Sequence, residues 1–270
     1  MLQMRNELLN DQLFRKLRHA AGRAVADFGM VEEGDRVAVA VSGGKDSYTM
    51  LLLLDELRRR APIRFDIVAV TIDSGYRGFR TDIIEKFVAE QGIKHHVEKT
   101  SHFDIISQKR RPGSSYCSIC ARLKRGALYG LATQLGCNKL ALGHHSDDFI
   151  ETLLLNQFFV GSLKAMSACM LADNGDTTVI RPLVYAAEAD IIRFSSENKL
   201  PVVCCCCPVC GKADVQRKRM KNLLKELEKE IPHIKNSMLK ALSNVHPRHL
   251  LDPHLMSDRP AAVTLENPPL

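Results

Sequence analysis

The sequence contains no run of apolar residues long enough to span a bilayer, and residues 1–10 lack the apolar centre of a signal peptide. These two absences argue against a membrane-spanning or secreted protein, so we expect a cytoplasmic one. The sequence also lacks internal repeats. Its 270 residues, 45% of them hydrophobic and 26% charged, suit one α/β domain with a smaller appended segment.

Without a secretory signal, the nine cysteines do not indicate a disulfide framework. Cys117 and Cys120 form one Cys-x-x-Cys pair, and Cys207 and Cys210 form a second at the end of a cysteine-rich run that begins at Cys204. Neither pair has a histidine ligand nearby. The spacing is therefore compatible with a four-thiolate zinc site or with an iron–sulfur cluster, and it does not choose between them.

Two widespread phosphate-binding patterns, the Walker loop and the Gly-x-Gly-x-x-Gly turn, are absent from the most informative stretch of the chain. The apolar run Val37–Val41 predicts a strand buried on both faces, and residues 48–57 predict a helix. The turn between them combines flexible glycines, two hydroxyls, an ammonium group and a helix N-terminus, which together favour phosphate binding. Its residues are Ser42, Gly43, Gly44, Lys45, Asp46 and Ser47.

The rest of the chain alternates predicted strands with predicted helices. Strands are expected at 65–73, 94–97 and 139–143, and helices within 1–30 and at 81–91, 188–198, 215–230 and 234–242. This alternation predicts an α/β fold with a doubly wound parallel sheet and helical additions at both ends. The expected divisions are an amphipathic extension (1–30), a nucleotide-binding domain (31–200), the cysteine motif with C-terminal helices (201–250) and a flexible tail (251–270).

Ligands in such sheets bind beyond the carboxyl ends of the strands, where Ser42, Asp73 and Gly143 are expected to meet. Gly143 opens the segment Gly-His-His-Ser-Asp-Asp, in which His144 and His145 could face a nucleotide. The neighbouring carboxylates suit magnesium binding or proton abstraction. The alternative is an acidic helix N-cap, in which Ser146 or Asp147 only satisfies backbone amides.

The net charge of +7 is compatible with a polyanionic partner. Basic residues occur in four short runs, at Arg58–Arg60, Lys109–Arg111, Arg122–Arg125 and Arg217–Arg219. Each run could bind such a partner or could simply be a solvated helix face.

The ordered set of motifs resembles one family. Ser-Gly-Gly-Lys-Asp-Ser resembles the pyrophosphate loop of ATP-pyrophosphatases. It is followed by Cys-Ser-Ile-Cys-Ala-Arg-Leu-Lys-Arg-Gly, Ala-Leu-Gly-His-His-Ser-Asp-Asp, Ile-Arg-Pro-Leu and Cys-Pro-Val-Cys-Gly. Together, over roughly residues 10–250, they resemble the bacterial tRNA 2-thiocytidine synthetases, which are ATP-dependent sulfurtransferases acting on cytidine 32 of the anticodon loop.

The resemblance implies an adenine nucleotide α-hydrolase-like fold that binds ATP and Mg²⁺. It implies activation of the C2 oxygen of the base as an adenylate, and a 4Fe-4S cluster held by only three cysteines. Cys117 and Cys120 match two ligands, Cys210 is the favoured third ligand and Cys207 the alternative. Asp46 and Asp147 are the candidate magnesium ligands.

The resemblance also implies catalytic roles for Lys124, Asp148 and Cys210. Lys124 follows Cys120 by four residues, so both can lie on one helix face. The implied partners are tRNA and a sulfur donor such as a cysteine desulfurase, and a homodimer is compatible with the sequence. The run Cys204–Cys206 has no counterpart in the family pattern; it could supply a fourth ligand or carry a persulfide.

Two other functions remain open. A related enzyme could make 2-thiouridine, but such relatives carry extra cysteine pairs near both termini, whereas no cysteine precedes Cys117 or follows Cys210 here. A zinc-stapled RNA-binding module without catalysis would use the four thiolates structurally, but it leaves the Ser-Gly-Gly-Lys-Asp-Ser loop unexplained.

Overall fold

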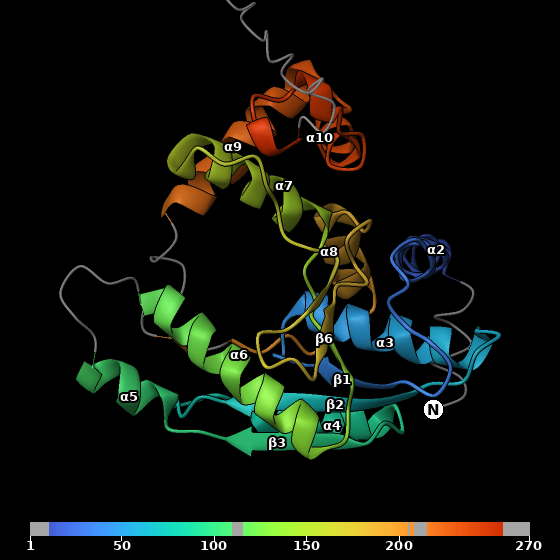
Figure 1. Ribbon diagram of the computed structural model, residues 1–270. Coiled ribbons are helices and arrows are strands. Elements are labelled where there is room, and N and C mark those ends of the chain that lie inside the picture. The colour runs from blue at the N-terminus through green and yellow to red at the C-terminus, as the bar shows by residue number, and fades with distance from the viewer. Residues whose placement is uncertain (1–10, 110–115, 205, 208–214, 256–270) are drawn as a thin grey trace, which may run out of the picture.

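A computed structural model of the chain describes residues 11–109, 116–204, 206–207 and 215–255 (Figure 1). Its centre is a six-stranded sheet with the strand order β3-β2-β1-β4-β6-β5. All neighbouring pairs are parallel except β5–β6, which is antiparallel. The strands are β1 Arg36–Ala40, β2 Asp66–Asp73, β3 His95–Lys99, β4 Lys139–Ala141, β5 Cys169–Leu171 and β6 Thr178–Ile180.

The predicted doubly wound parallel sheet is confirmed, and alternate residues of β1 show how it is covered. Val37 and Val39 belong to a large apolar core, whereas Ala38 belongs to a second core on the opposite face. The first core takes side chains from helices α2 (Gln12–Asp27), α3 (Lys45–Arg60), α4 (Thr81–Glu90) and α8 (Glu188–Glu197), and the second takes them from α6 (Tyr116–Gln134). Because successive strand residues point to opposite faces, a strand with helices on both sides must be apolar at nearly every position.

The predicted helices in the described residues are present. Their ends lie within one residue of the prediction except for the N-terminal helix and the helix predicted at 48–57, which extends three residues further at each end. Helix α5 was not predicted. For α6, the sequence indicated a helix around Cys120 and Lys124 but not its full length. The residues 1–10 of the predicted N-terminal extension and residues 256–270 of the predicted tail lie outside the described residues. The helices are α2 Gln12–Asp27, α3 Lys45–Arg60, α4 Thr81–Glu90, α5 His102–Lys109, α6 Tyr116–Gln134, α7 Ser146–Leu155, α8 Glu188–Glu197, α9 Val215–Glu230 and α10 Ile234–Ala241.

Helix α2 packs into the main core along one face. Its buried residues include Leu13, Phe14 and Leu17, and the Phe14 ring stacks on Phe194 of α8 with centroids 5.6 Å apart. The spacing of three and four residues that predicts an amphipathic helix therefore corresponds to the side that is buried.

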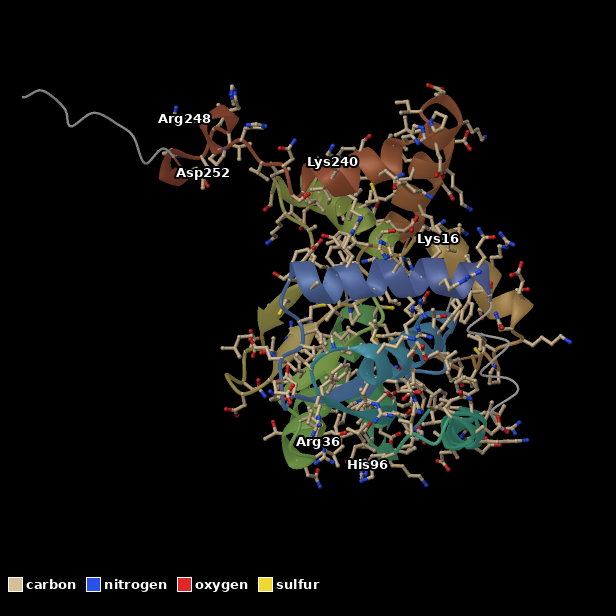
Figure 2. All side chains as sticks on the ribbon, turned by 90° about the vertical axis from the view of Figure 1, so that its right-hand side faces the viewer. Lys16, Arg36, His96, Lys240, Arg248 and Asp252 are labelled. Carbon is tan, nitrogen blue, oxygen red and sulfur yellow. The ribbon has the colours of Figure 1, made fainter. Side chains whose placement is uncertain are left out.

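Helices α9 and α10 lie on α7, away from the sheet (Figure 1). Met220 and Leu224 of α9 are buried against Ile150 and Leu154 of α7 in a separate small core. Lys240 of α10 accordingly lies at the opposite end of the molecule from Arg36 and His96 (Figure 2). In the part of the chain that the structure describes, no helix is long and apolar enough to cross a membrane.

Candidate active site

The turn between β1 and α3 has a backbone that only glycine accommodates. Gly43 has a φ of +82°, in the left-handed region. A Cβ atom there would also lie 3.0 Å from Cδ1 of Ile84 and 3.1 Å from Cβ of Val203. The glycine is therefore required both by the turn and by the two segments packed against it.

The N-terminus of α3 leaves its first amides available. Gly44 is the N-cap residue and no side chain caps the helix. The Ser47 hydroxyl instead closes the loop: it donates to the Gly44 carbonyl at 2.8 Å and accepts from the Ser42 amide at 3.2 Å. Uncapped amides at a helix N-terminus, beside Lys45, are suited to bind an anion such as a phosphate.

The carboxyl ends of three strands meet at this loop, as predicted. A Cβ atom on Gly143, which follows β4, would lie 3.3 Å from the backbone of Asp46 and Ser47, so the two turns are in close contact. Asp73 ends β2, and its side chain accepts a hydrogen bond from the Gly75 amide at 2.9 Å. Asp73 thus shapes the turn, and its neighbour Ser74 faces the site.

A cavity of about 310 Å³ opens beside the loop. Ser42, Gly44 and Lys124 line it, as the sequence predicts for a site shared by the loop and α6. Ser74 was not predicted, yet its buried hydroxyl has no hydrogen-bond partner among the described residues, so it is free to bind a ligand. The lining residues are Ser42, Gly44, Ile72, Ser74, Tyr76, Phe79, Lys124, Val203 and Cys204.

The two cysteine motifs approach each other beside this cavity. Sγ of Cys120, in the second turn of α6, lies 3.5 Å from the hydroxyl of Tyr76. Cys120, Cys206 and Cys207 all pack against the small apolar cluster around Tyr76 and Tyr116. Burial and the hydrogen bond with Cys120 raise the pKa of Tyr76, so its hydroxyl stays protonated beside the thiols.

The cysteine run is attached directly to the phosphate-binding loop. The Val203 amide donates to the Gly43 carbonyl at 2.9 Å, and the next residue, Cys204, lines the cavity. Cys206 has a φ of +51°, and its amide donates to Sγ of Cys204 at 3.3 Å.

The predicted cluster ligands are only partly described. Cys210 lies outside the described residues, and Cys117 is exposed in the first turn of α6. Among the described residues, no three histidine, cysteine or acidic side chains are close enough to share one metal ion. The structure therefore brings Cys120 and Cys207 to one apolar cluster and leaves the complete ligand set a prediction.

His144 and His145 differ in their partners. His144 accepts a hydrogen bond at Nδ1 from Nε of Arg181 at 3.3 Å. Burial, together with this guanidinium, lowers the pKa of His144 to about 4, so the ring is neutral near pH 7. Nε2 of His145 lies 3.8 Å from Oδ1 of Asp46, and its buried Nδ1 has no hydrogen-bond partner among the described atoms.

Lys45 belongs to a chain of charges that the sequence did not reveal. Its ammonium group lies 3.0 Å from Asp46 and 3.4 Å from Glu188, the first residue of α8. Glu188 also pairs with Lys221 of α9. Burial opposes the charge on Lys45, but the two carboxylates outweigh it and raise its pKa. The charged form of this lysine is thus strongly favoured.

Asp147 and Asp148 have structural partners. Asp147 accepts a hydrogen bond from the Glu188 amide at 2.8 Å and lies 3.2 Å from the ammonium group of Lys235 in α10. Asp148 accepts from the His145 amide at 3.0 Å and pairs with Arg217 at 3.2 Å. Asp147 thus satisfies a backbone amide, as the N-cap alternative states, but at the start of α8; at the start of α7 that contact is made by Asp148, which the alternative did not name.

The basic residues at 217, 221 and 235 look from sequence like solvated helix positions. No local signal could have found them, because each meets its carboxylate only after α9 and α10 have packed on α7. Their positions show that the C-terminal helices contribute charge to the candidate site.

Comparisons with known proteins identify the family. A family model described as a PP-loop domain matches residues 12–204. The tRNA-cytidine(32) 2-sulfurtransferase of Geobacter metallireducens is 70% identical over 249 residues, which cover 92% of this chain and 97% of that protein. The protein of the same name from Pelobacter propionicus is 74% identical over 243 residues, which cover 90% of each. This chain belongs to the tRNA-cytidine(32) 2-sulfurtransferase family.

Family membership confirms the resemblance that the motifs indicate. The sulfurtransferase from Syntrophotalea carbinolica is 56% identical over 248 residues, so the similarity extends through both cysteine motifs and the C-terminal helices. Among solved structures, the U34-tRNA thiolase NcsA from Methanococcus maripaludis, determined with its 4Fe-4S cluster, has a TM-score of 0.69 and 22% identity, covering 86% of this chain and 78% of that chain. At that identity the similarity establishes the fold of this sulfurtransferase-family chain.

Proposed function

We propose that this protein thiolates tRNA, using ATP to activate C2 of cytidine 32 in the anticodon loop and replacing the C2 oxygen with sulfur. The observation that carries the proposal is the shared cavity. The phosphate-binding loop, Lys124 of α6 and Cys204 of the cysteine run all line it. Activation of a base and delivery of sulfur to the same carbon require this proximity.

ATP fits the loop. The uncapped amides of α3, the ammonium group of Lys45 and the unpartnered hydroxyl of Ser74 can bind phosphate or ribose oxygens. We assign magnesium to Asp46, because it belongs to the phosphate-binding loop; its carboxylate now pairs with the ammonium group of Lys45 at 3.0 Å, a contact that the metal would replace. Asp147 is the second candidate, because it lies outside the phosphate-binding loop and its oxygens already contact Lys235 of α10 and the Glu188 amide.

The chemistry then needs two displacements. The C2 oxygen of the base attacks the α-phosphorus of ATP, and pyrophosphate leaves. Sulfide sulfur next attacks C2, the C–O bond breaks, and AMP leaves with the former base oxygen. Lys124, which lines the cavity, would stabilise the negative charge that develops on the phosphate during both steps.

The thiols suit an iron–sulfur cluster. Soft thiolate ligands gathered beside an apolar cluster match the donors of such clusters. A 4Fe-4S cluster held by three cysteines would keep one iron open to carry the sulfide. Cys117 and Cys120 are the proposed first two ligands. Because Cys207 packs against the same apolar cluster as Cys120, it is as strong a candidate for the third as Cys210.

Asp148 remains our predicted catalytic carboxylate, although its described oxygens cap α7 and pair with Arg217. Full thiolation by Asp148→Asn would remove it from the mechanism. A cysteine desulfurase as sulfur donor, a homodimer and a cytoplasmic location remain predictions as well.

The test is thiolation in vitro under anaerobic conditions. Purified protein, ATP, Mg²⁺, sulfide and a tRNA transcript carrying cytidine 32 should yield 2-thiocytidine, detected by nucleoside mass spectrometry, together with pyrophosphate. A transcript with uridine 32 is the matched control. Formation of 2-thiouridine instead, or of no thiolated base, would contradict the proposal.

Metal analysis separates the cluster from a zinc staple. We expect about four irons per chain and a broad charge-transfer absorption band. Both should be lost in Cys120→Ala, and comparison of Cys207→Ala with Cys210→Ala identifies the third ligand. Cys137→Ala is the control, because Cys137 is buried in the core beneath α6. One zinc per chain without iron would favour the structural RNA-binding module.

A further inference from the structure

Helix α7 leads away from the candidate site into a compact loop. It continues as the π-helical turn η1 (Asn156–Val160), and the chain reverses at Gly161, whose φ is +71°. The Ser162 amide donates to the Asn156 carbonyl at 3.0 Å, and the Asn156 side chain donates to the Lys164 carbonyl at 2.9 Å. These bonds tie the two ends of the segment together and give it a defined shape.

We name residues 156–164 the phenylalanine loop, because it exposes large apolar side chains. At least half of the surface of each remains in contact with solvent: Phe158 57%, Phe159 50%, Val160 65% and Leu163 59%. Several large apolar side chains held outward by one short, well-bonded loop indicate a binding surface rather than isolated exposed residues.

The surroundings of the loop are cationic. No aspartate or glutamate occurs from Thr152 to Ala172, and Lys164 is exposed at the base of the loop. Helix α9 runs antiparallel to α7, since Arg217 pairs with Glu151 while Lys221, one turn later, pairs with Glu188 beside the start of α7.

The antiparallel arrangement directs the N-terminal end of α9 toward η1 (Figure 1). Two residues of that end, Lys218 and Arg219, are exposed. The apolar surface of the phenylalanine loop therefore has Lys164 at its base, and exposed cations stand on the end of α9 that contacts α7 through Arg217 and Glu151.

We propose that the phenylalanine loop docks the single-stranded anticodon loop of tRNA. Phe158 and Phe159 would stack on unpaired bases next to the target, and Lys164, Lys218 and Arg219 would bind the neighbouring phosphates. The proposal rests on the proposed function. Helix α7 has 10 residues and so spans about 15 Å between the candidate site and the loop. A short stretch of single-stranded RNA can cover that distance.

A second copy of the chain is a poorer occupant. In a two-fold interface the same patch faces itself, which would bring Lys164, Lys218 and Arg219 of one copy toward the same cations of the other. RNA, in contrast, offers both the π-faces for the two rings and the negative charge for the rim.

The test is the affinity for an anticodon stem-loop, measured by fluorescence anisotropy without ATP. The double variant Phe158→Leu/Phe159→Leu keeps apolar side chains but removes both rings, and it should bind at least tenfold more weakly. Phe158→Tyr/Phe159→Tyr should bind like the wild type. The matched control is Phe28→Leu, because Phe28 is an exposed phenylalanine that contacts Tyr185 at the end of α2.

The cationic residues near the phenylalanine loop are tested by the salt dependence of RNA binding. Lys218→Gln/Arg219→Gln should reduce the slope of log Kd against log salt by about one for each phosphate that the variant no longer neutralises. Unchanged affinity in the leucine variant would overturn the proposal. Conversion of a dimer to a monomer in that variant, with RNA binding intact, would identify the patch as a self-interface and would also overturn it.

Thiolation by the wild-type protein is scored separately. A wild type that binds the stem-loop through these rings but forms no 2-thiocytidine would leave the docking surface standing and contradict the proposed function. A wild type that forms 2-thiocytidine but does not bind the stem-loop would overturn the docking surface and leave the proposed function standing.

Discussion

Glu188 connects the phosphate-binding loop with the C-terminal helices. One of its oxygens lies 3.4 Å from the ammonium group of Lys45, and the other pairs with Lys221. Burial alone would raise the pKa of Glu188, but these two cations outweigh it and lower the pKa. The carboxylate therefore stays charged, and its charge is shared between a loop residue and a helix residue.

Removal of Lys221 should weaken ATP binding. In Lys221→Met the full charge of Glu188 falls on Lys45 and holds its ammonium group away from the nucleotide phosphates. We expect Kd for ATP, measured by calorimetry without tRNA, to rise about threefold to tenfold, since partly exposed ion pairs are worth on the order of 1 kcal/mol.

Lys221→Arg should restore the affinity, because it keeps the charge at the same place. Lys225→Met is the matched control: Lys225 is exposed one turn further along α9. Equal affinity in the wild type and Lys221→Met would show that Glu188 does not influence the loop.

His144 should make stability depend on pH. Its pKa is lowered to about 4 in the folded protein, compared with about 6.5 in the unfolded chain. Between these values the unfolded chain binds more protons, so the free energy of unfolding falls as pH drops from 6.5 toward 4. The contribution is at most on the order of 3 kcal/mol.

Urea unfolding at a series of pH values checks this expectation. His144→Gln should lose less stability over that window than the wild type, because glutamine does not titrate. If the free energy of unfolding fell equally with pH in the two proteins, the titration of His144 would not be the cause of the loss of stability at acidic pH.

At the scale of elements, the loop between β1 and α3 depends on one glycine. Gly43→Ala should weaken ATP binding more than tenfold, because the methyl group would lie 3.0 Å from Ile84 and would move the Val203 segment. Gly34 offers a matched control, since its φ is also +82° but nothing lies within 4 Å of a Cβ there.

Both alanine variants should lose about 1 kcal/mol of stability through backbone strain. Only Gly43→Ala should lose nucleotide binding, measured by calorimetry. Equal ATP affinity in the two variants would contradict the role assigned to the close approach at Gly43.

Sequence reasoning predicted elements with a strong local signature. The β1–loop–α3 unit was found because a buried apolar run, a glycine pair and a following run of helix-forming residues are all local features. The short strand β5 was missed because its three residues, Cys169–Leu171, are partly or largely exposed and their pairing with β6 is not a property of the segment itself. Long-range pairings of this kind are fixed by the whole fold.

The candidate site shows the same division. Ser42 and Gly143 were predicted because parallel strands end at one edge of the sheet, and Lys124 because its motif resembles that of a known family. Glu188 and Arg217 were not, because an isolated charge on a helix gives no sign of the partner it meets. Ser74 had a weak signal, as it directly follows the strand-ending Asp73.

At the scale of the whole molecule, the basic runs are not equivalent. Arg58 and Arg59 pair with Asp55 on their own helix, whereas Arg122 and Arg125 of α6 are exposed beside the cysteine motif. Only the second pair is positioned to bind tRNA near the candidate site.

Salt dependence of tRNA binding distinguishes the two runs. Arg122→Gln/Arg125→Gln should lower the slope of log Kd against log salt by about two. Arg58→Gln/Arg59→Gln, the matched control, should leave that slope unchanged. A larger effect from the control pair would place the RNA on the other face of the protein.

The amide of Val203 holds the carbonyl of Gly43, and the cysteine run starts at the next residue. The cysteine run and the phosphate-binding loop are therefore directly connected. We expect oxidation of the thiols to alter the loop that binds the nucleotide. A protein whose thiols have been oxidised should therefore stop cleaving ATP, instead of cleaving it without forming thiolated tRNA. We expect air exposure to abolish tRNA-stimulated pyrophosphate release together with thiolation. Continued pyrophosphate release after thiolation has stopped would show that the cysteine run and the phosphate-binding loop are not coupled. The hydrogen bond between Val203 and Gly43 would then prevent the protein from consuming ATP after oxygen has inactivated its thiols.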